Sequence, residues 1–121
     1  MSHELTRTYR FEAAHWLPEV PENHPCHVLH GHSYEIDIRI RGELDPRLGW
    51  VLDFAEIDRV IDPLVGELDH HCLNEIDGLD NPTSELLAEW VWARASLGLS
   101  GLAAVVVRET AHSAAIYRGP S

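Results

Sequence analysis

The sequence predicts an α+β fold, a two-layer sandwich of one four-stranded antiparallel sheet and two helices. Strand-like segments occur in two pairs, one near each end of the chain, and two stretches with helical periodicity lie between them. The expected order is strand, strand, helix, helix, strand, strand. Because the strands of each pair follow one another closely in the chain, we expect each pair to lie antiparallel.

The first two strands are expected at residues 5–11 and 33–42. In the second, isoleucines alternate with charged residues, which predicts one buried and one wet face: Ile36, Ile38 and Ile40 against Asp37, Arg39 and Arg41. Residues 14–32, between the strands, contain three prolines, at positions 18, 21 and 25, and show little periodicity. Such a composition is typical of a loop.

After a turn, residues 50–53 are expected to form a brief strand, and Asp53 to cap the first helix. Apolar residues recur along this helix at spacings of three and four: Ile57, Val60, Ile61, Leu64, Val65 and Leu68. Pro63 falls within the pattern and is expected to kink the helix or to mark a second start.

Asn81 as the cap and Pro82 at the first helical position predict a second helix, which Gly98 ends. The last two strands are expected at residues 102–109 and 114–118. A four-stranded sheet has two open edges, and a small protein has to cover them. Joining these edges between subunits would do so, and we therefore expect an oligomer.

The length of 121 residues, with 45% hydrophobic content, predicts one domain spanning residues 1–121. No stretch approaches the roughly 20 consecutive apolar residues of a membrane span, and the amino terminus lacks the pattern of a signal peptide. These features lead us to expect a cytoplasmic protein without a membrane partner.

The chain carries 20 acidic residues against nine basic ones, all arginines, for a formal net charge of -11. This charge argues against nucleic acid as a partner, because the phosphates would be repelled. A phosphorylated small molecule would need a local concentration of positive charge, supplied by arginines and a bound cation.

The histidines suggest a zinc site. His30 and His32 are two residues apart at the start of the second strand, so their side chains share one face, roughly 6.6 Å apart along the backbone. His15 follows the first strand and would come close when the two strands pair. Catalytic zinc sites commonly use three protein ligands and leave one position open. An isolated pair of this kind also arises by accident in a histidine-rich loop.

Cys26 lies in the same loop, where a nearby dication would favour its thiolate form, so it is a candidate acid/base group. Two cysteines are too few for a disulfide scaffold. The rival interpretation is a closed structural site in which Cys26 is the fourth metal ligand. Cys72 is expected to face the core as a small apolar residue.

Two acidic positions complete the candidates. Asp69 and His70 follow the first helix, where they form either a proton-transfer dyad or a solvated helix end. Glu109 ends an apolar strand, where it either reaches water or anchors a donor-rich ligand. The residues alone leave both choices open.

Six motifs in register resemble the 6-carboxy-tetrahydropterin synthase branch of the 6-pyruvoyl-tetrahydropterin synthase family. They span almost the whole chain and read FEAAHWLP, C-x-x-x-H-G-H-S-Y, WVLDFAEI, LDHHCLN, NPTSE and VVVRET followed by IYRG. The resemblance implies the tunnelling fold, in which three subunits join their sheets into a barrel and two trimers form a homohexamer. It places the active sites between subunits.

By position, the resemblance also implies roles for individual residues. Zn²⁺ would be held by His15, His30 and His32. The proton-accepting thiol would be Cys26, and the proton relay would be Asp69 with His70. The pterin anchor would be Glu109, and two further residues near the pterin would be Thr83 and Glu85. Thr83 and Glu85 also suit the first turn of a helix.

The implied reaction converts a pterin triphosphate, 7,8-dihydroneopterin triphosphate, to 6-carboxy-5,6,7,8-tetrahydropterin, acetaldehyde and triphosphate, toward queuosine. The implied enzyme is a carbon–carbon and carbon–oxygen lyase. Family members that replace a folate-pathway aldolase carry glutamate where this chain has Leu29, which speaks against that activity. The alternatives are 6-pyruvoyl-tetrahydropterin synthase, which keeps the side chain, and a noncatalytic zinc- or pterin-binding module.

Overall fold

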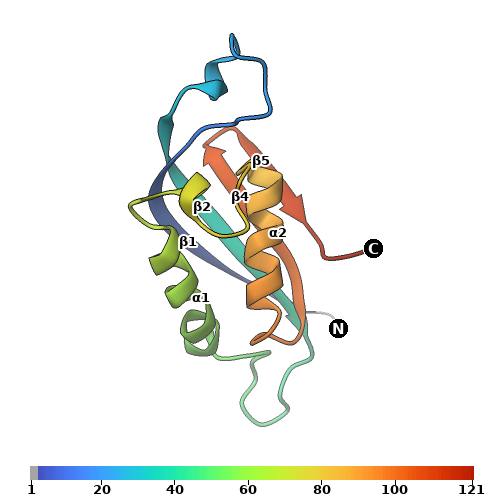
Figure 1. The fold of residues 1–121 in the computed structure, drawn as a ribbon. Coiled ribbons are helices and arrows are strands. Elements are labelled where there is room, and N and C mark those ends of the chain that lie inside the picture. The colour runs from blue at the N-terminus through green and yellow to red at the C-terminus, as the bar shows by residue number, and fades with distance from the viewer. Residues whose placement is uncertain (1–2) are drawn as a thin grey trace.

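The computed structural model describes residues 3–121 and shows one sheet with two helices packed on one of its faces (Figure 1). The elements follow in the order β1 (His3–His15), η1 (Pro25–His27), β2 (His30–Gly42), α1 (Phe54–Leu68), β3 (His71–Cys72), η2 (Leu73–Glu75), α2 (Ser84–Ala95), β4 (Leu102–Thr110) and β5 (Ser113–Tyr117). The predicted α+β two-layer sandwich is confirmed. The sheet is open in the single chain, with β3 and β5 at its edges.

The sheet has five strands rather than four, in the order β3-β1-β2-β4-β5. Both predicted pairs are antiparallel, β1 with β2 and β4 with β5. The unpredicted strand, β3, is two residues long and runs parallel to β1. Its sequence is too short to carry a periodicity. Hydrogen bonds from neighbouring residues place it instead, since the His70 N–H donates to the Glu12 carbonyl over 2.6 Å.

Two details before and within α1 differ from expectation. Residues 50–53 form bends and not a strand, because the Trp50 carbonyl accepts a hydrogen bond from Asp45 within the turn and the segment pairs with no strand of the described chain. Asp53 caps α1 as predicted, accepting from the Ala55 N–H over 2.9 Å. The helix then continues through Pro63 without a second start. Pro63 lies on the exposed side, where water can satisfy the carbonyl that it leaves unpaired.

The second helix begins later than predicted. Thr83, not Asn81, is its cap, and the Thr83 hydroxyl accepts a hydrogen bond from the Leu86 N–H over 3.1 Å. A hydroxyl three residues before an amide is well placed to satisfy it. Pro82 therefore lies outside the helix, and its carbonyl is free to make a contact elsewhere.

The core lies between the sheet and the helices. The three alternating isoleucines of β2 are fully buried, as the pattern predicts, and pack in one cluster with residues of both helices: Ile36, Ile38, Ile40, Ile57, Ile61, Leu64, Leu68, Leu87 and Val91. Within residues 3–121, no helix combines the length and the apolar composition needed to cross a membrane.

Truncating the centre of this core should be costly. Ile38→Ala is expected to lower the free energy of unfolding by about 2–5 kcal/mol, because Ile38 is completely buried and the cavity cannot fully close. Urea denaturation would measure the loss. The matched control is Leu97→Ala, since Leu97 is 88% exposed and its truncation should change stability by less than about 0.5 kcal/mol. Equal effects of the two changes would contradict this account of the core.

Candidate metal centre and active site

The pairing of β1 with β2 brings three histidines together on the helix-covered face of the sheet. His15 lies directly opposite His30 in the register, and His32 follows two residues later on the same face. One ligand nitrogen from each of the three side chains lies within 4.8 Å of the others. Their ring centroids are 4.6 to 5.0 Å apart. The arrangement suits a single metal ion.

Hydrogen bonds to the Nδ1 atoms of His15 and His30 leave the Nε2 atoms of these rings free to bind a metal. Nδ1 of His15 lies 2.9 Å from the Pro82 carbonyl, and Nδ1 of His30 lies 2.6 Å from the Val28 carbonyl. A carbonyl only accepts, so each Nδ1 carries the proton and each Nε2 presents a lone pair. Nε2 of His15 is buried without a hydrogen-bond partner. Burial also lowers the pKa of His15, which favours the neutral ring. These features fit zinc.

Cys26 lies in η1, within the loop that extends beyond the end of the sheet (Figure 1). Two backbone hydrogen bonds position it: its N–H donates to His24 Nδ1 over 3.0 Å, and its carbonyl accepts from Leu17 N–H over 2.8 Å. Its half-buried thiol is not part of the ligand group, which in residues 3–121 consists of three histidines. The structure therefore gives no support to a closed site with a thiolate ligand.

Glu109 lies near the end of β4 and faces the histidines. Its Oε1 is 3.9 Å from Nε2 of His15, and its Oε2 is 3.8 Å from Nε2 of His32. The end of β4 thus places the Glu109 carboxylate beside the candidate metal ligands, so this side chain does not simply extend into solvent.

The dyad of Asp69 and His70 forms at the end of α1. Asp69 Oδ2 lies 3.0 Å from His70 Nδ1, and Asp69 Oδ1 accepts from the Glu12 N–H over 2.9 Å. The Glu12 N–H and then His70 lower the pKa of Asp69, so its carboxylate stays ionised. His70 has a φ of 59°, a left-handed conformation that non-glycine residues seldom adopt. Its ring is also 78% exposed, so the dyad and the solvated helix end coexist.

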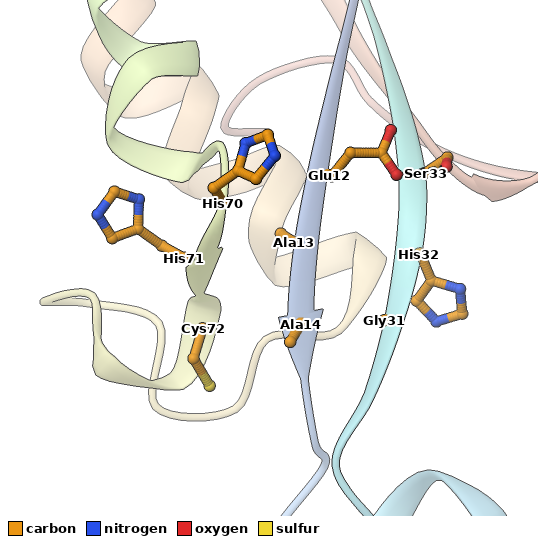
Figure 2. Close-up of a pocket in the computed structure, with 9 residues that line it drawn as sticks. All are labelled: Glu12, Ala13, Ala14, Gly31, His32, Ser33, His70, His71 and Cys72. Atoms are coloured by element: carbon orange, nitrogen blue, oxygen red, sulfur yellow. Dashed lines mark hydrogen bonds between the residues drawn. The ribbon is translucent and has the colours of Figure 1, made fainter.

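An open groove of about 480 Å³ lies beside this dyad (Figure 2). Its wall includes His32 of β2 and, from a second part of the chain, His70 and Cys72. Cys72 was expected in the core, and this expectation is wrong: the side chain is half-buried and lines the groove. Within residues 3–121, β3 is an edge strand of the sheet, and Cys72 lies outside the core cluster.

A second hollow, of about 410 Å³, connects α2 with the last two strands. Glu85, Ser84 and Glu109 line it together. Thr83 directly precedes Ser84, which lines this hollow, but the Thr83 hydroxyl caps α2. Of the two weaker candidates, Glu85 thus shares a cavity with Glu109, whereas the observed contact of Thr83 is within the helix.

Comparison with known proteins identifies the family. The sequence model of the family described as 6-pyruvoyl tetrahydropterin synthase matches residues 4–120. The chain belongs to this family. A 6-carboxy-5,6,7,8-tetrahydropterin synthase from Synechocystis is 39% identical over 122 residues, covering 96% of this chain and 93% of the relative. A dihydroneopterin monophosphate aldolase from Pyrococcus furiosus is 41% identical over 91 residues, covering 75% and 73%.

A solved structure of the same family has the same fold. The 6-pyruvoyl tetrahydropterin synthase of Caenorhabditis elegans superposes with a TM-score of 0.90 at 25% identity, covering 98% of this chain and 96% of that one. The relatives are pterin synthases and a pterin aldolase, so membership of the 6-pyruvoyl tetrahydropterin synthase family supports an enzyme that acts on pterins.

In this family member, two residues next to the candidate metal ligands were missed by sequence reasoning. The Pro82 carbonyl holds His15, and the Tyr34 hydroxyl lies 3.2 Å from the same Nδ1. Burial and then the Glu109 carboxylate raise the pKa of Tyr34, so the hydroxyl stays protonated. A signal for Tyr34 existed, because it follows His32 by two residues and so shares its face. No sequence signal pointed to the Pro82 carbonyl, which lies 67 residues from its partner.

Proposed function

We propose that this chain is a zinc-dependent 6-carboxy-5,6,7,8-tetrahydropterin synthase. It would convert 7,8-dihydroneopterin triphosphate and water to 6-carboxy-tetrahydropterin, acetaldehyde and triphosphate, as a lyase in queuosine biosynthesis. The observation that carries the proposal is the group of three converging histidines in a chain that is 39% identical to an enzyme of this name. Leu29, in place of the glutamate of aldolase-type members, favours the synthase over the aldolase activity.

In this proposal His15, His30 and His32 hold the metal. Zinc at this position would supply positive charge toward oxygens of the substrate side chain. Nε2 of His15 and Nε2 of His30 would face the ion, because a backbone carbonyl binds the Nδ1 of each ring.

The proton-transfer steps are assigned to Cys26 and His70. Cys26 lies in the loop that follows β1. As a thiolate, it takes a proton from a carbon of the substrate side chain. His70 returns a proton on the other side of the reacting carbon. The ionised Asp69, at 3.0 Å, orients the His70 ring for this transfer.

The remaining residues position the substrate. Glu109 accepts hydrogen bonds from a ring N–H and the amino group of the pterin, and Glu85 lines the same hollow. Thr83 would act through its position at the start of α2. Arginines and the bound cation offset the repulsion between the triphosphate and a chain of net charge -11.

We propose further that residues 1–121 act as one synthase domain in the cytoplasm, assembled as a homohexamer of two trimers. The edges at β3 and β5 support this assembly, since each has a neighbouring strand on one side only within residues 3–121. Joining the sheets of three subunits at these edges would close a barrel.

One incubation tests the function. Zinc-loaded protein with dihydroneopterin triphosphate is expected to release acetaldehyde and yield 6-carboxy-tetrahydropterin, identified by product mass. A product that retains the side chain would show a 6-pyruvoyl-tetrahydropterin synthase instead. Binding of the pterin without any product would indicate a noncatalytic module. A parallel incubation with zinc removed by a chelator is the control, and it should give no product.

A further inference from the structure

The carboxylate of Glu109 faces two of the three metal-ligand nitrogens without bonding to them. Its two oxygens lie 3.9 and 3.8 Å from Nε2 of His15 and of His32. Hydrogen bonds between nitrogen and oxygen are about 2.7–3.2 Å long. These separations are therefore too long for direct hydrogen bonds, although the oxygens and nitrogens face one another.

The same separations are slightly longer than those between groups that share an ion. Nitrogen and oxygen ligands about 2.0–2.2 Å from a tetrahedral zinc lie about 3.3–3.5 Å from each other. The carboxylate oxygens exceed that spacing by about 0.5 Å. They are closer to His15 and His32 than the 4.8 Å within which the three histidine nitrogens lie. Glu109 is not a member of the three-histidine group, but its oxygens need to move by only about 0.5 Å toward His15 and His32 to reach the spacing of ligands on one zinc.

The charge of Glu109 also calls for a cation. Its side chain is 27% exposed, and a partly buried carboxylate needs a compensating charge. In residues 3–121, its ion-pair partners are His15 and His32, and no arginine forms an ion pair with it. Arg108, its neighbour in sequence, binds Asp37 over 2.9 Å instead. A metal ion held by the three histidines would place a positive charge beside this carboxylate.

We infer that Glu109 is the fourth ligand of the metal in the substrate-free protein, and that it leaves the metal when the pterin arrives. The metal site is then closed at rest, and the substrate opens it by offering Glu109 the donors of its ring. The resting ligand depends on this chain alone. The release step rests on the proposed function, in which the same carboxylate anchors the pterin.

Cobalt substitution tests the resting ligand, because the absorption of bound Co²⁺ reports its ligands. Glu109→Gln is expected to change the cobalt spectrum of the substrate-free protein and to weaken zinc binding at least about tenfold in a chelator competition. Glu85→Gln is the matched control. It removes a carboxylate from the same hollow, but Glu85 has no ion pair with the histidines, so both readouts should stay at the wild-type values.

A wild-type cobalt spectrum and wild-type zinc affinity in Glu109→Gln would overturn the inference. Circular dichroism checks that the variant is folded. If it is not, Glu109→Asp serves in its place, because it keeps the charge but draws the carboxylate away from the metal, and its cobalt spectrum should also change.

Adding 7,8-dihydroneopterin, which lacks the triphosphate, tests the release. It should shift the wild-type cobalt spectrum and leave that of Glu109→Gln nearly unchanged, and a wild-type spectrum that does not respond would contradict release. The outcome is separable from the proposed function. A spectrum that depends on Glu109 without turnover of the triphosphate would uphold the resting ligand and refute the synthase. Turnover with a spectrum independent of Glu109 would do the reverse.

Discussion

Replacing Cys26 by alanine is expected to lower turnover by about 10²–10⁴-fold, the usual contribution of a general acid or base, while zinc stays bound. Zinc should remain because the thiol is not part of the three-histidine group. The loop should keep its shape, since the two hydrogen bonds that position Cys26 use its backbone N–H and carbonyl. Product formation measures the first effect, and elemental analysis measures the second.

The second cysteine offers the control for this change. Cys72→Ala removes a thiol of similar exposure from β3 and is expected to keep most of the turnover. Undiminished activity of Cys26→Ala would remove the thiol from the mechanism. Loss of zinc from that variant would instead revive the closed site in which sulfur is a ligand.

Replacing His30 by alanine is expected to reduce zinc well below one ion per chain and to abolish turnover. One of the three imidazoles would be lost, and even with the Glu109 carboxylate inferred above the remaining set would have one ligand fewer than the four of a tetrahedral zinc site. The fold should survive, because His30 lies at the first residue of β2 and outside the core cluster. Elemental analysis after gel filtration gives the zinc content, and circular dichroism reports the fold.

His112→Ala is the control for this change, because His112 is exposed in the turn between β4 and β5 and is absent from the ligand group. It should bind zinc as the wild-type protein does. Full zinc occupancy in His30→Ala would show that the proposed ligand set is wrong, and equal losses in both variants would indicate nonspecific binding.

Sequence periodicity predicted the parts of the fold that local chemistry controls. Alternation of Ile36, Ile38 and Ile40 determined which face of β2 is buried, and the burial is complete. Asp53 was predicted as a cap because a carboxylate directly before a helical pattern can accept a hydrogen bond from a free N–H of the first turn, and it does so from Ala55. The start of α2 was misplaced by two residues, since Asn81 and Thr83 are both good caps and only the chain path selects between them.

For the candidate site, the sequence indicated which side chains belong to the site, but it indicated less well which residues contact them. The two-residue step from His30 to His32 predicts a shared face in any strand, and pairing with β1 predicts that His15 comes near. The approach of Glu109 to these rings, at 3.8 and 3.9 Å, depends on where β4 ends relative to β2. No pattern within β4 specifies that offset.

The sequence by itself thus determined the α+β class, the buried face of each main strand and the three histidines, because each follows from spacings of a few residues. Only the tertiary structure decided the hydrogen bond of the Pro82 carbonyl to His15, the place of the two-residue β3, and the carboxylate beside the imidazoles. Those contacts join residues far apart in the chain, and their geometry depends on how the sheet and helices pack as a whole. Local preferences carry no information about such distances.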